Sequence, residues 1–385
     1  MKRIIVLLLM LVMCIGFVSA CSSDSPEGVA TLPPSPSEPA PPADVTAPVE
    51  ATPDIPELPA EPAFVDFTDS VDRKVEVPKI VTSVSPSGSV AQMFLLAIAP
   101  DLMVTVASEY KEQQIQFVPD YVTKLPVVGA FYGSADINYE TIASVNPEIV
   151  IDVGEPKGTI VEDMDEIMTT IAIPAVHITA TLQSSPEAFR MLGALLGREE
   201  KGEQLALFCE KILAQTDGIM AQVGNNKINA LYCLGAEGQN VIASTSFHAE
   251  VIDYVMNNLA VVDSPASKGS GNETDMEQIS VWNPDFVIFG HESVYSKVAD
   301  DAAWSTLPAI KNGSYIEVPF GPYDWIGNPP SINRYLSMVW LTKVLYPEFA
   351  SFDLHEQIKE YYGLFYGYDL TTAKYDELTI NALVK

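Results

Sequence analysis

The same short module occurs twice in this chain. The segment "NYETIASVNPEIVI" covers residues 138–151, and "DMEQISVWNPDFVI" covers residues 275–288. When Glu140 is aligned on Glu277, both copies carry an isoleucine two positions later, then an Asn-Pro pair, an acidic residue and an apolar run. The offset is constant at 137 positions, without a gap. Because internal repetition marks repeated structural units, the two copies predict two similar halves.

Length and charge are compatible with two halves. A chain of 385 residues has room for about two domains, since domains are usually on the order of 150 residues long. The formal net charge of -30 makes the surface strongly acidic. Such a surface repels nucleic acid and anionic lipid headgroups, so we expect no polyanionic partner. A solubilising role accounts for most of this charge.

The N-terminus carries the pattern of an export signal. Lys2 and Arg3 precede an apolar run over residues 4–18, and small residues follow it. This predicts a signal peptide over residues 1–20. A membrane-spanning helix is the alternative, but the run is short for one. The signal ends in "VSAC", which resembles the bacterial lipobox and implies that Cys21 is lipidated; an ordinary secreted protein cut nearby is the other interpretation.

A polar segment separates Cys21 from the rest of the chain. Residues 22–63 are rich in proline, alanine, serine and acidic residues and contain no lysine or arginine. Such a composition cannot form a core. At about 3.1 Å per residue for a proline-stiffened chain, it can hold a domain roughly 100 Å from its anchor. Residues 21–63 are therefore predicted to be a lipidated, disordered tether, and the lipid is the only expected attachment to the membrane, on its extracytoplasmic face.

The remaining sequence predicts an α/β fold. Residues 64–78 alternate apolar and polar side chains, as a β-hairpin does. Strands then alternate with helices over residues 64–183 and again over 227–385, with C-terminal helices from about residue 331. Alternation of this kind indicates parallel sheets with helices on both faces. We expect two doubly wound parallel-sheet lobes with a ligand cleft between them.

A long helical segment joins the two predicted lobes. In residues 184–226, Ser184 or Ser185 is expected to begin one helix and Gly197 to end it. A second helix of about 25 residues follows and spans roughly 40 Å, long enough to act as a strut between the lobes.

Prolines and cysteines complete the structural expectations. Pro147 and Pro284 are expected to end the module helices and to hold the preceding residue in an extended conformation.

Cys209 lies in a helical pattern and Cys233 in the apolar strand "NALYCLG", so both are expected to be small buried apolar residues; a disulfide between them is the alternative for an exported protein. Neither belongs to a metal-ligand spacing.

The order of these parts resembles the class III substrate-binding lipoproteins of ABC importers. The resemblance begins at about Phe64 and rests on the lobes, the long helix and the repeated "E…NP[DE]…VI" unit. The segment "VPFGPYDWIGNPPSINRYLSMVWLTKVLYPE" is similar to the last strand, cleft loop and helix of iron-uptake members. That family serves ferric siderophores, haem, cobalamin and, in some members, molybdate or tungstate. The resemblance implies capture of an iron chelate or related metal complex and its delivery to a permease dimer with its ATPase.

The resemblance also assigns a role to the repeated module. In the cobalamin-binding member, the glutamate of each module meets an arginine pocket on one permease subunit, so Glu140 and Glu277 are the implied docking carboxylates. Two symmetry-related permease subunits require two similar contacts. The alternative is that each glutamate is a solvated charge on an exposed helix.

Candidate ligand-binding residues follow the predicted strands, because ligands bind beyond the carboxyl ends of parallel strands. They are Ser87, Gly88, Tyr110, Tyr132, Gly154 and Glu155 in the first lobe, and His248, His291, Asp324, Trp325 and Arg334 in the second. Aromatic residues there suit a large, partly apolar ligand. By resemblance, Tyr132 and Trp325 are the foremost cleft aromatics, although either could instead support its loop. The two histidines could donate hydrogen bonds or ligate a metal of the substrate, or simply face solvent.

The predicted cleft contains few cations. Only Lys157 and Arg334 lie in or near its loops, whereas relatives that bind anionic catecholates or citrate present several arginines. This favours a neutral or weakly charged chelate, although backbone amides at helix starts can also hold an oxyanion. A bare oxyanion such as molybdate therefore stays open as the alternative ligand.

The sequence disfavours two other classes of function. A hydrolase is disfavoured because the sequence contains no nucleophile elbow, "HExxH" or "GxxxxGK" motif. A binder of free metal ions needs three or four histidine and carboxylate ligands at strand ends, and the first lobe has only His177, within an apolar strand. We therefore expect no catalytic residues, no metal site and no cofactor, only a bound metal chelate.

Overall fold

The computed structural model of the protein describes residues 63–131 and 137–384. The predicted signal peptide, Cys21 and the tether up to residue 62 lie outside the described residues, and so does Tyr132. Within the described part of the chain, no helix is both long and apolar enough to cross a membrane.

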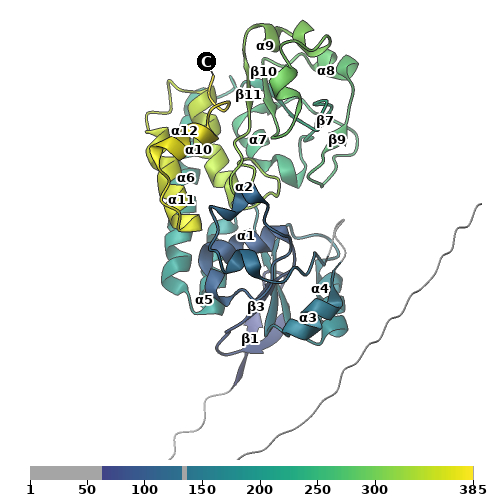
Figure 1. Cartoon of the computed structure of the whole chain (residues 1–385), viewed down its shortest axis with the longest axis vertical. Helices are drawn as coiled ribbons and strands as arrows, with labels where there is room; N and C mark the ends of the chain where they lie inside the picture. The colour runs from purple at the N-terminus through teal and green to yellow at the C-terminus, as the bar shows by residue number, and fades with distance from the viewer. Residues whose placement is uncertain (1–62, 132–136, 385) are drawn as a thin grey trace, which may run out of the picture. The chain divides into compact units, whose positions relative to one another are not determined.

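The first lobe contains the predicted hairpin and a parallel sheet. Strands β1 (Phe64–Thr68) and β2 (Lys74–Pro78) pair antiparallel, which confirms the hairpin. The sheet has the order β3-β4-β5, and both pairs are parallel. Its strands are β3 (Val84–Pro86), β4 (Ile149–Gly154) and β5 (Ala175–Thr179). The helices are α1 (Ser89–Ile98), α2 (Glu112–Ile115), α3 (Tyr139–Val145) and α4 (Ile160–Ile171), which lie around this sheet in Figure 1.

The second lobe is built on a larger, mixed sheet. Its order is β11-β10-β6-β7-β9, with β8 also paired to β6. The strands are β6 (Asn229–Leu234), β7 (Asn240–Val241), β8 (Asn257–Asn258), β9 (Asn272–Glu273), β10 (Phe286–Phe289) and β11 (Tyr315–Glu317). Helices α7 (Glu250–Val255), α8 (Met276–Trp282) and α9 (Pro308–Lys311) accompany it. The β6, β8, β10 and β11 pairs are parallel, as predicted, but β7 and β9 add an antiparallel edge that the sequence pattern did not predict.

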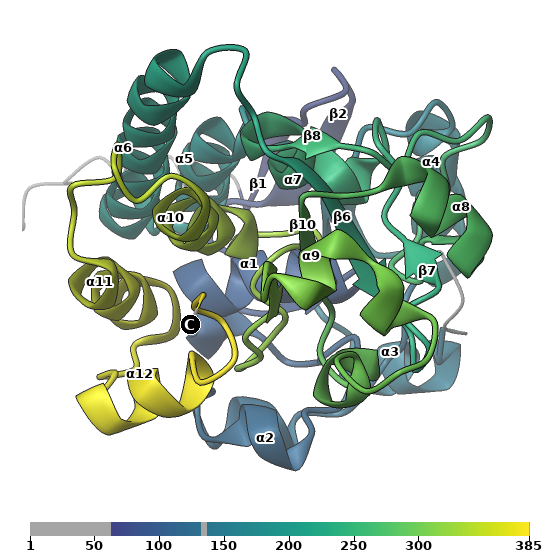
Figure 2. The same cartoon turned by 90° about the horizontal axis from the view of Figure 1, so that it is seen from above.

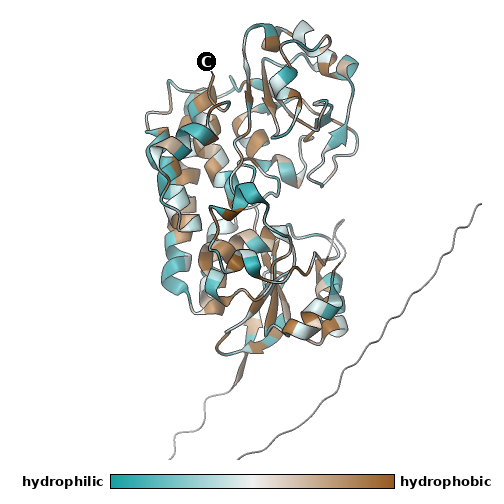
Figure 3. Cartoon of the chain, in the orientation of Figure 1, coloured by the Kyte–Doolittle hydropathy of each residue, from teal (hydrophilic) through white to brown (hydrophobic). Residues whose placement is uncertain are grey.

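Both sheets bury both faces, which is what double winding requires. In β4, Ile149 and Ile151 belong to one hydrophobic core with α1, whereas Val150 belongs to another with α3 and α4. In β6, Tyr232 and Cys233 are divided between two cores in the same way. Because successive strand side chains point to opposite faces, this division places helices on each side of each sheet. Apolar residues accordingly concentrate on the strands in Figure 3.

A pair of helices joins the two lobes. Helix α5 (Ser185–Leu196) begins after Ser184 and ends at Gly197, whose φ of 62° is left-handed, as expected for a C-cap. Helix α6 (Glu199–Val223) has 25 residues, which confirms the predicted strut. Figure 1 shows α6 extending beside both lobes.

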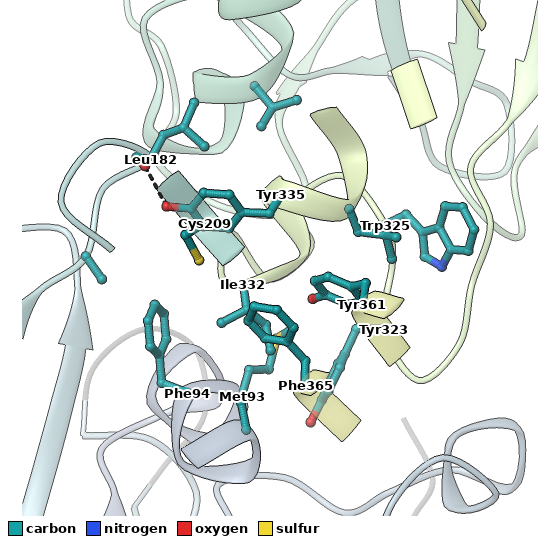
Figure 4. Packing of buried hydrophobic residues seen from close by; sticks show 14 of the residues in the cluster. Met93, Phe94, Leu182, Cys209, Tyr323, Trp325, Ile332, Tyr335, Tyr361 and Phe365 are labelled. Atoms are coloured by element: carbon teal, nitrogen blue, oxygen red, sulfur yellow. Dashed lines mark hydrogen bonds between the residues drawn. The ribbon is translucent and has the colours of Figure 1, made fainter. Parts of the chain in front are cut away.

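The C-terminal helices reinforce this connection. They are α10 (Asn333–Leu345), α11 (Leu354–Tyr366) and α12 (Thr372–Leu378). Figure 2 shows α5, α6, α10 and α11 gathered along one side of the sheets. Phe189 of α5 packs between Phe94 of α1 and Phe365 of α11, with ring centroids 4.8 and 5.9 Å away. Figure 4 shows Phe94 and Phe365 within this continuous core, which therefore ties the first lobe to the C-terminal helices.

Helices α5 and α6 approach closely at glycines. A Cβ added to Gly202 would lie 2.6 Å from the carbonyl oxygen of Phe189, so Gly202→Ala is expected to lower the free energy of unfolding by about 1–3 kcal/mol. Gly218 of the same helix has nothing within 4 Å of its Cβ position, and Gly218→Ala is expected to raise stability by about 0.5–1 kcal/mol. Urea unfolding of both variants checks this contrast. Equal stability changes would contradict the close packing.

The two repeated modules have the same structure. Helices α3 and α8 each have seven residues and are followed by a parallel strand, as predicted. The residue before each proline, however, is not extended. Asn146 (φ 50°, ψ 62°) and Asn283 (φ 45°, ψ 64°) are both left-handed, which corrects our expectation. Proline disfavours the right-handed helical region for the preceding residue, and asparagine tolerates the left-handed one, where it caps the helix C-terminus.

The two cysteines are free thiols. Cys209 in α6 and Cys233 in β6 are both fully buried, as expected for small apolar residues, and they form no disulfide with each other. Burial raises the pKa of each thiol well above its usual value, which keeps both uncharged.

Candidate functional site

Ser87, the predicted residue directly after β3, belongs to a polar network on the first-lobe sheet. The Ser87 hydroxyl donates a hydrogen bond to the Asp152 carboxylate, whose other oxygen lies 2.6 Å from His177 Nδ1. His177 Nε2 in turn lies 3.2 Å from the Thr179 hydroxyl. All four residues are buried or partly buried. The side chain of Ser87 is therefore committed to an internal polar network, which satisfies the buried carboxylate.

Gly88 and Gly154, the two predicted glycines, determine the backbone conformation directly after β3 and at the end of β4. Gly88 is the N-cap of α1 in an extended conformation, and its Cβ position lies 3.7 Å from Ala130. Gly154 ends β4 with a φ of 150°, a conformation that favours glycine, and its Cβ position lies 3.6 Å from Val90. Both glycines thus set the course of the chain where β3 and β4 end.

Tyr110 connects the two lobes. The Tyr323 hydroxyl, on the loop after β11, donates to the Tyr110 hydroxyl over 3.3 Å, and the Gln92 amide donates to Tyr323 over 3.1 Å. The two rings meet edge to face at 6.3 Å. Burial raises the pKa of Tyr110, so its hydroxyl stays protonated and serves as a hydrogen-bonding group.

Glu155 and His248 each make a polar contact in the second lobe. The Ser267 hydroxyl of the second lobe donates to Glu155 Oε2 over 3.0 Å. His248 Nδ1 lies 3.1 Å from the carbonyl oxygen of Gly327, and burial lowers the pKa of His248 although the Glu155 charge acts to raise it. The contact of Glu155 with Ser267 therefore joins the two lobes, whereas the contact of His248 with Gly327 lies within the second lobe.

Trp325 is buried rather than exposed to a ligand. It has 0% of its surface exposed and is one of the buried residues drawn in Figure 4. Its indole N–H donates to the Tyr362 hydroxyl over 3.1 Å, and its ring meets Trp340 at 6.1 Å between centroids. In this arrangement it is the loop-supporting wedge that was the alternative to a cleft aromatic. A large apolar ring contributes most to stability where it is fully packed.

Asp324 organises the same loop. Its Oδ1 accepts hydrogen bonds from the backbone N–H groups of Ile326 and Gly327 over 2.8 and 3.0 Å, and its Oδ2 accepts one from the Tyr232 hydroxyl over 3.0 Å. Burial raises the pKa of Asp324, and these donors oppose that rise. All three bonds are internal, so in this structure the carboxylate faces the protein interior.

Arg334, the cation predicted for the cleft, is an interlobe anchor here. It is 1% exposed, it pairs with Glu250, and one guanidinium N–H donates to the carbonyl oxygen of Ala180 over 2.7 Å. Glu250 also accepts from the backbone N–H of Leu182 over 3.0 Å. The guanidinium lies 4.9 Å from the centroid of the Phe247 ring. Two second-lobe side chains thereby hold the segment that follows β5.

A cavity of about 290 Å³ lies where both lobes contribute residues. The first lobe supplies Gln113, Gln116 and Phe117 from α2 and the residues after it. The second lobe supplies His291, the strand-end segment 317–320, and residues 377–381 of and after α12, apart from Thr379. His291 is exposed and stacks on Phe320 at 4.7 Å between ring centroids. Among the residues that the structure describes, it is the one predicted ligand-binding residue in this lining.

The sequence pattern did not predict most of the residues that line this cavity. Glu317 is the last residue of β11 and Phe320 follows it closely, so the strand-end argument could have found them. The lining residues of and after α12 carry no such signal, because α12 does not lie directly after a predicted strand.

The two predicted docking glutamates occupy equivalent places. Glu140 in α3 and Glu277 in α8 both lie in the first turn and are exposed. The side chains of Asn138 and Asp275 cap the two helices by accepting from the backbone N–H of Thr141 and Gln278, respectively. Each carboxylate is thus presented by the same local geometry.

The described residues contain no group of three or more histidine, cysteine or acidic side chains arranged to hold a metal ion. Two α/β lobes joined by one long helix, with a cavity between α2 and the strand ends of the second lobe, define the two-lobed class of solute-binding folds. Residues 84–321, more than half of the chain, match the model of that class named Periplasmic binding protein. The chain therefore belongs to the periplasmic binding protein family.

Individual relatives share this fold at low sequence identity. The Fe(3+)-citrate-binding protein YfmC of Bacillus subtilis (strain 168) is 22% identical over 221 residues, which are 57% of this chain and 66% of the relative. An ABC transporter solute binding protein from Sulfurospirillum deleyianum DSM 6946 superposes with a TM-score of 0.75 at 24% identity, covering 81% of this chain and 98% of that one. A periplasmic solute binding protein from Veillonella parvula DSM 2008 gives 0.69 at 23% identity, with 83% and 98% covered. The match spans just under two thirds of the length of the curated relative.

Proposed function

We propose that this protein is the substrate-binding component of an ABC importer and that it captures an iron chelate, such as a ferric siderophore, or a related metal complex such as haem or cobalamin. The observation that carries the proposal is a cavity lined by both lobes, at the strand ends of the second lobe, because ligands bind beyond the carboxyl ends of parallel strands. Membership of the periplasmic binding protein family and a relative named for ferric citrate binding support it.

The proposed mechanism is capture without chemistry. Ligand enters at the lobe boundary, and contacts such as Glu155 to Ser267 and Tyr110 to Tyr323 form as the lobes approach. Helix α6 and the aromatic core shared by α1, α5 and α11 limit the relative motion of the lobes. The loaded protein is recognised because ligand favours the closed arrangement over the open one.

Delivery is proposed to use the two repeated modules. Glu140 and Glu277 would each meet a basic pocket on one permease subunit, and the partner ATPase would drive release. The matched helices and matched exposure of the two carboxylates support this role. Lipidation at Cys21 and the tether over residues 22–63 would hold the protein on the extracytoplasmic face of the membrane.

A bare oxyanion is the second candidate ligand, and the cavity argues against it. The lining includes the carboxylates Glu317 and Glu377, and a buried oxyanion next to a carboxylate is repelled. The apolar residues of the cavity lining, which include Phe117 and Phe320, are better matched to a larger ligand with an organic shell.

A ligand titration tests the proposed function. The purified protein is titrated separately with ferric siderophores, haem, cobalamin and molybdate while tryptophan fluorescence is followed, with calorimetry as the second readout. Saturable binding of one class of metal complex is expected. Absence of binding in every titration, together with turnover of an ester or phosphate substrate, would replace the proposal with a hydrolase.

A further inference from the structure

We infer that the cavity between α2, the ends of β10 and β11, and α12 binds metal chelates of neutral or positive charge in preference to anionic ones. This inference rests on the proposed function and names its substrate class. It concerns the 290 Å³ cavity that contains His291 and Glu317.

The charged side chains that line this cavity are carboxylates. Glu317 and Glu377 both line the cavity, whereas the described residues contribute no lysine or arginine to it. Glu377 is paired with Lys374 of the same helix over 2.6 Å, which reduces its effect. Glu317 is half-buried, and its Oε2 accepts from the Asn381 amide over 2.8 Å. That amide orients the carboxylate without neutralising it, so Glu317 is the main fixed charge facing a ligand.

The remaining lining is neutral and suited to an organic shell. Phe117, Val318 and Phe320 supply apolar surface, and His291 is stacked on Phe320. Gln113 and Gln116 supply amide groups that both donate and accept hydrogen bonds. A chelate with apolar arms and amide or hydroxamate groups meets complementary surface here, whereas a ligand covered with carboxylate or catecholate oxygens finds no cation to pair with.

Arg334, a cation at the lobe boundary, does not change this balance. Arg334 is buried, bound to Glu250 and to the carbonyl oxygen of Ala180, so its charge is already satisfied. The chain as a whole carries a formal net charge of -30. The long-range field therefore acts in the same direction as Glu317, because a strongly acidic surface slows the approach of anions and speeds that of cations.

A series of ferric complexes that differ in charge tests the inference. The purified protein is titrated with a ferric complex of a linear, amine-bearing trihydroxamate, which is singly positive, a neutral ferric trihydroxamate, a triply negative ferric triscatecholate and ferric citrate. We expect the neutral and positive complexes to bind at least about tenfold more tightly than the anionic ones, a ratio that one carboxylate near the ligand can produce.

Two variants locate the effect. Glu317→Gln keeps the shape of the side chain and removes its charge, so it is expected to weaken the positive complex and strengthen the negative one, changing their affinity ratio by about tenfold. Glu166→Gln on the exposed face of α4 makes the same charge change outside the lining and is expected to leave the ratio within about twofold.

Each outcome of this experiment has a distinct meaning. If the negative complexes bind most tightly to the wild-type protein, the charge inference is wrong while the proposed function stands. If the ratio is as expected but Glu317→Gln and Glu166→Gln affect it equally, the ligand does not occupy this cavity and the inference is overturned. If no metal complex binds at all, the proposed function fails, and the inference fails with it.

Discussion

Replacing Arg334 by methionine is expected to lower the free energy of unfolding by about 3–5 kcal/mol, because it leaves a partly buried carboxylate without its partner. Glu250 would keep its bond from the Leu182 N–H but lose the guanidinium, and the carbonyl oxygen of Ala180 would lose its donor. Since these groups join the second lobe to the segment after β5, the loss also loosens the lobe connection. Urea unfolding followed by circular dichroism measures the change.

A surface arginine provides the matched control. Arg190 of α5 pairs with Glu203 and Glu210, but all three side chains are substantially exposed, and Arg190→Met is expected to cost less than about 1 kcal/mol. Combining Arg334→Met with Glu250→Leu removes both charges and is expected to recover part of the lost stability, because an apolar pair leaves no unpaired charge. Equal losses for the Arg334 and Arg190 variants would show that the buried pair is not an anchor.

Arg334 also shows what the sequence could and could not predict about the site. Its position at the start of a helix after the β11 loop was predicted correctly, and that position does lie at the lobe boundary. The direction of its side chain depends on Glu250 and on the carbonyl oxygen of Ala180, which are 84 and 154 positions away in sequence. No local pattern encodes such contacts. The same reason explains why Trp325, correctly placed on the loop, is packed against Trp340 and Tyr362.

The architecture was more predictable than the site because its signals are local and repeated. Gly197 ends α5 and the helical pattern continues to Val223, so the strut could be read from a single segment. The repeated module predicts one helix and one strand in each lobe. The two-residue strands β7 and β9, by contrast, are too short to show alternation, and the cavity needs α12 to lie near α2, a contact between parts of the chain that are far apart in sequence.

Reversing both proposed docking charges is expected to reduce uptake of the transported complex at least about tenfold, because like charges placed opposite each other at an interface cost several kcal/mol. The change is the double variant Glu140→Lys and Glu277→Lys. Both side chains are exposed in the first turns of α3 and α8 and lie outside the cavity lining, so ligand affinity is expected to stay within about twofold of the wild type. Uptake is measured with the permease and ATPase in proteoliposomes, and affinity by titration of the free protein.

The single variants and a charge-matched control separate docking from a general charge effect. Each single reversal removes one of two equivalent contacts and is expected to give an intermediate loss of uptake. The control combines Glu166→Lys with Glu348→Lys, two exposed glutamates outside the modules, and makes the same change in net charge. Uptake by the control is expected to remain near that of the wild type. If the control loses as much uptake as the double docking variant, overall charge rather than the two matched modules governs delivery, and the docking role of Glu140 and Glu277 is wrong.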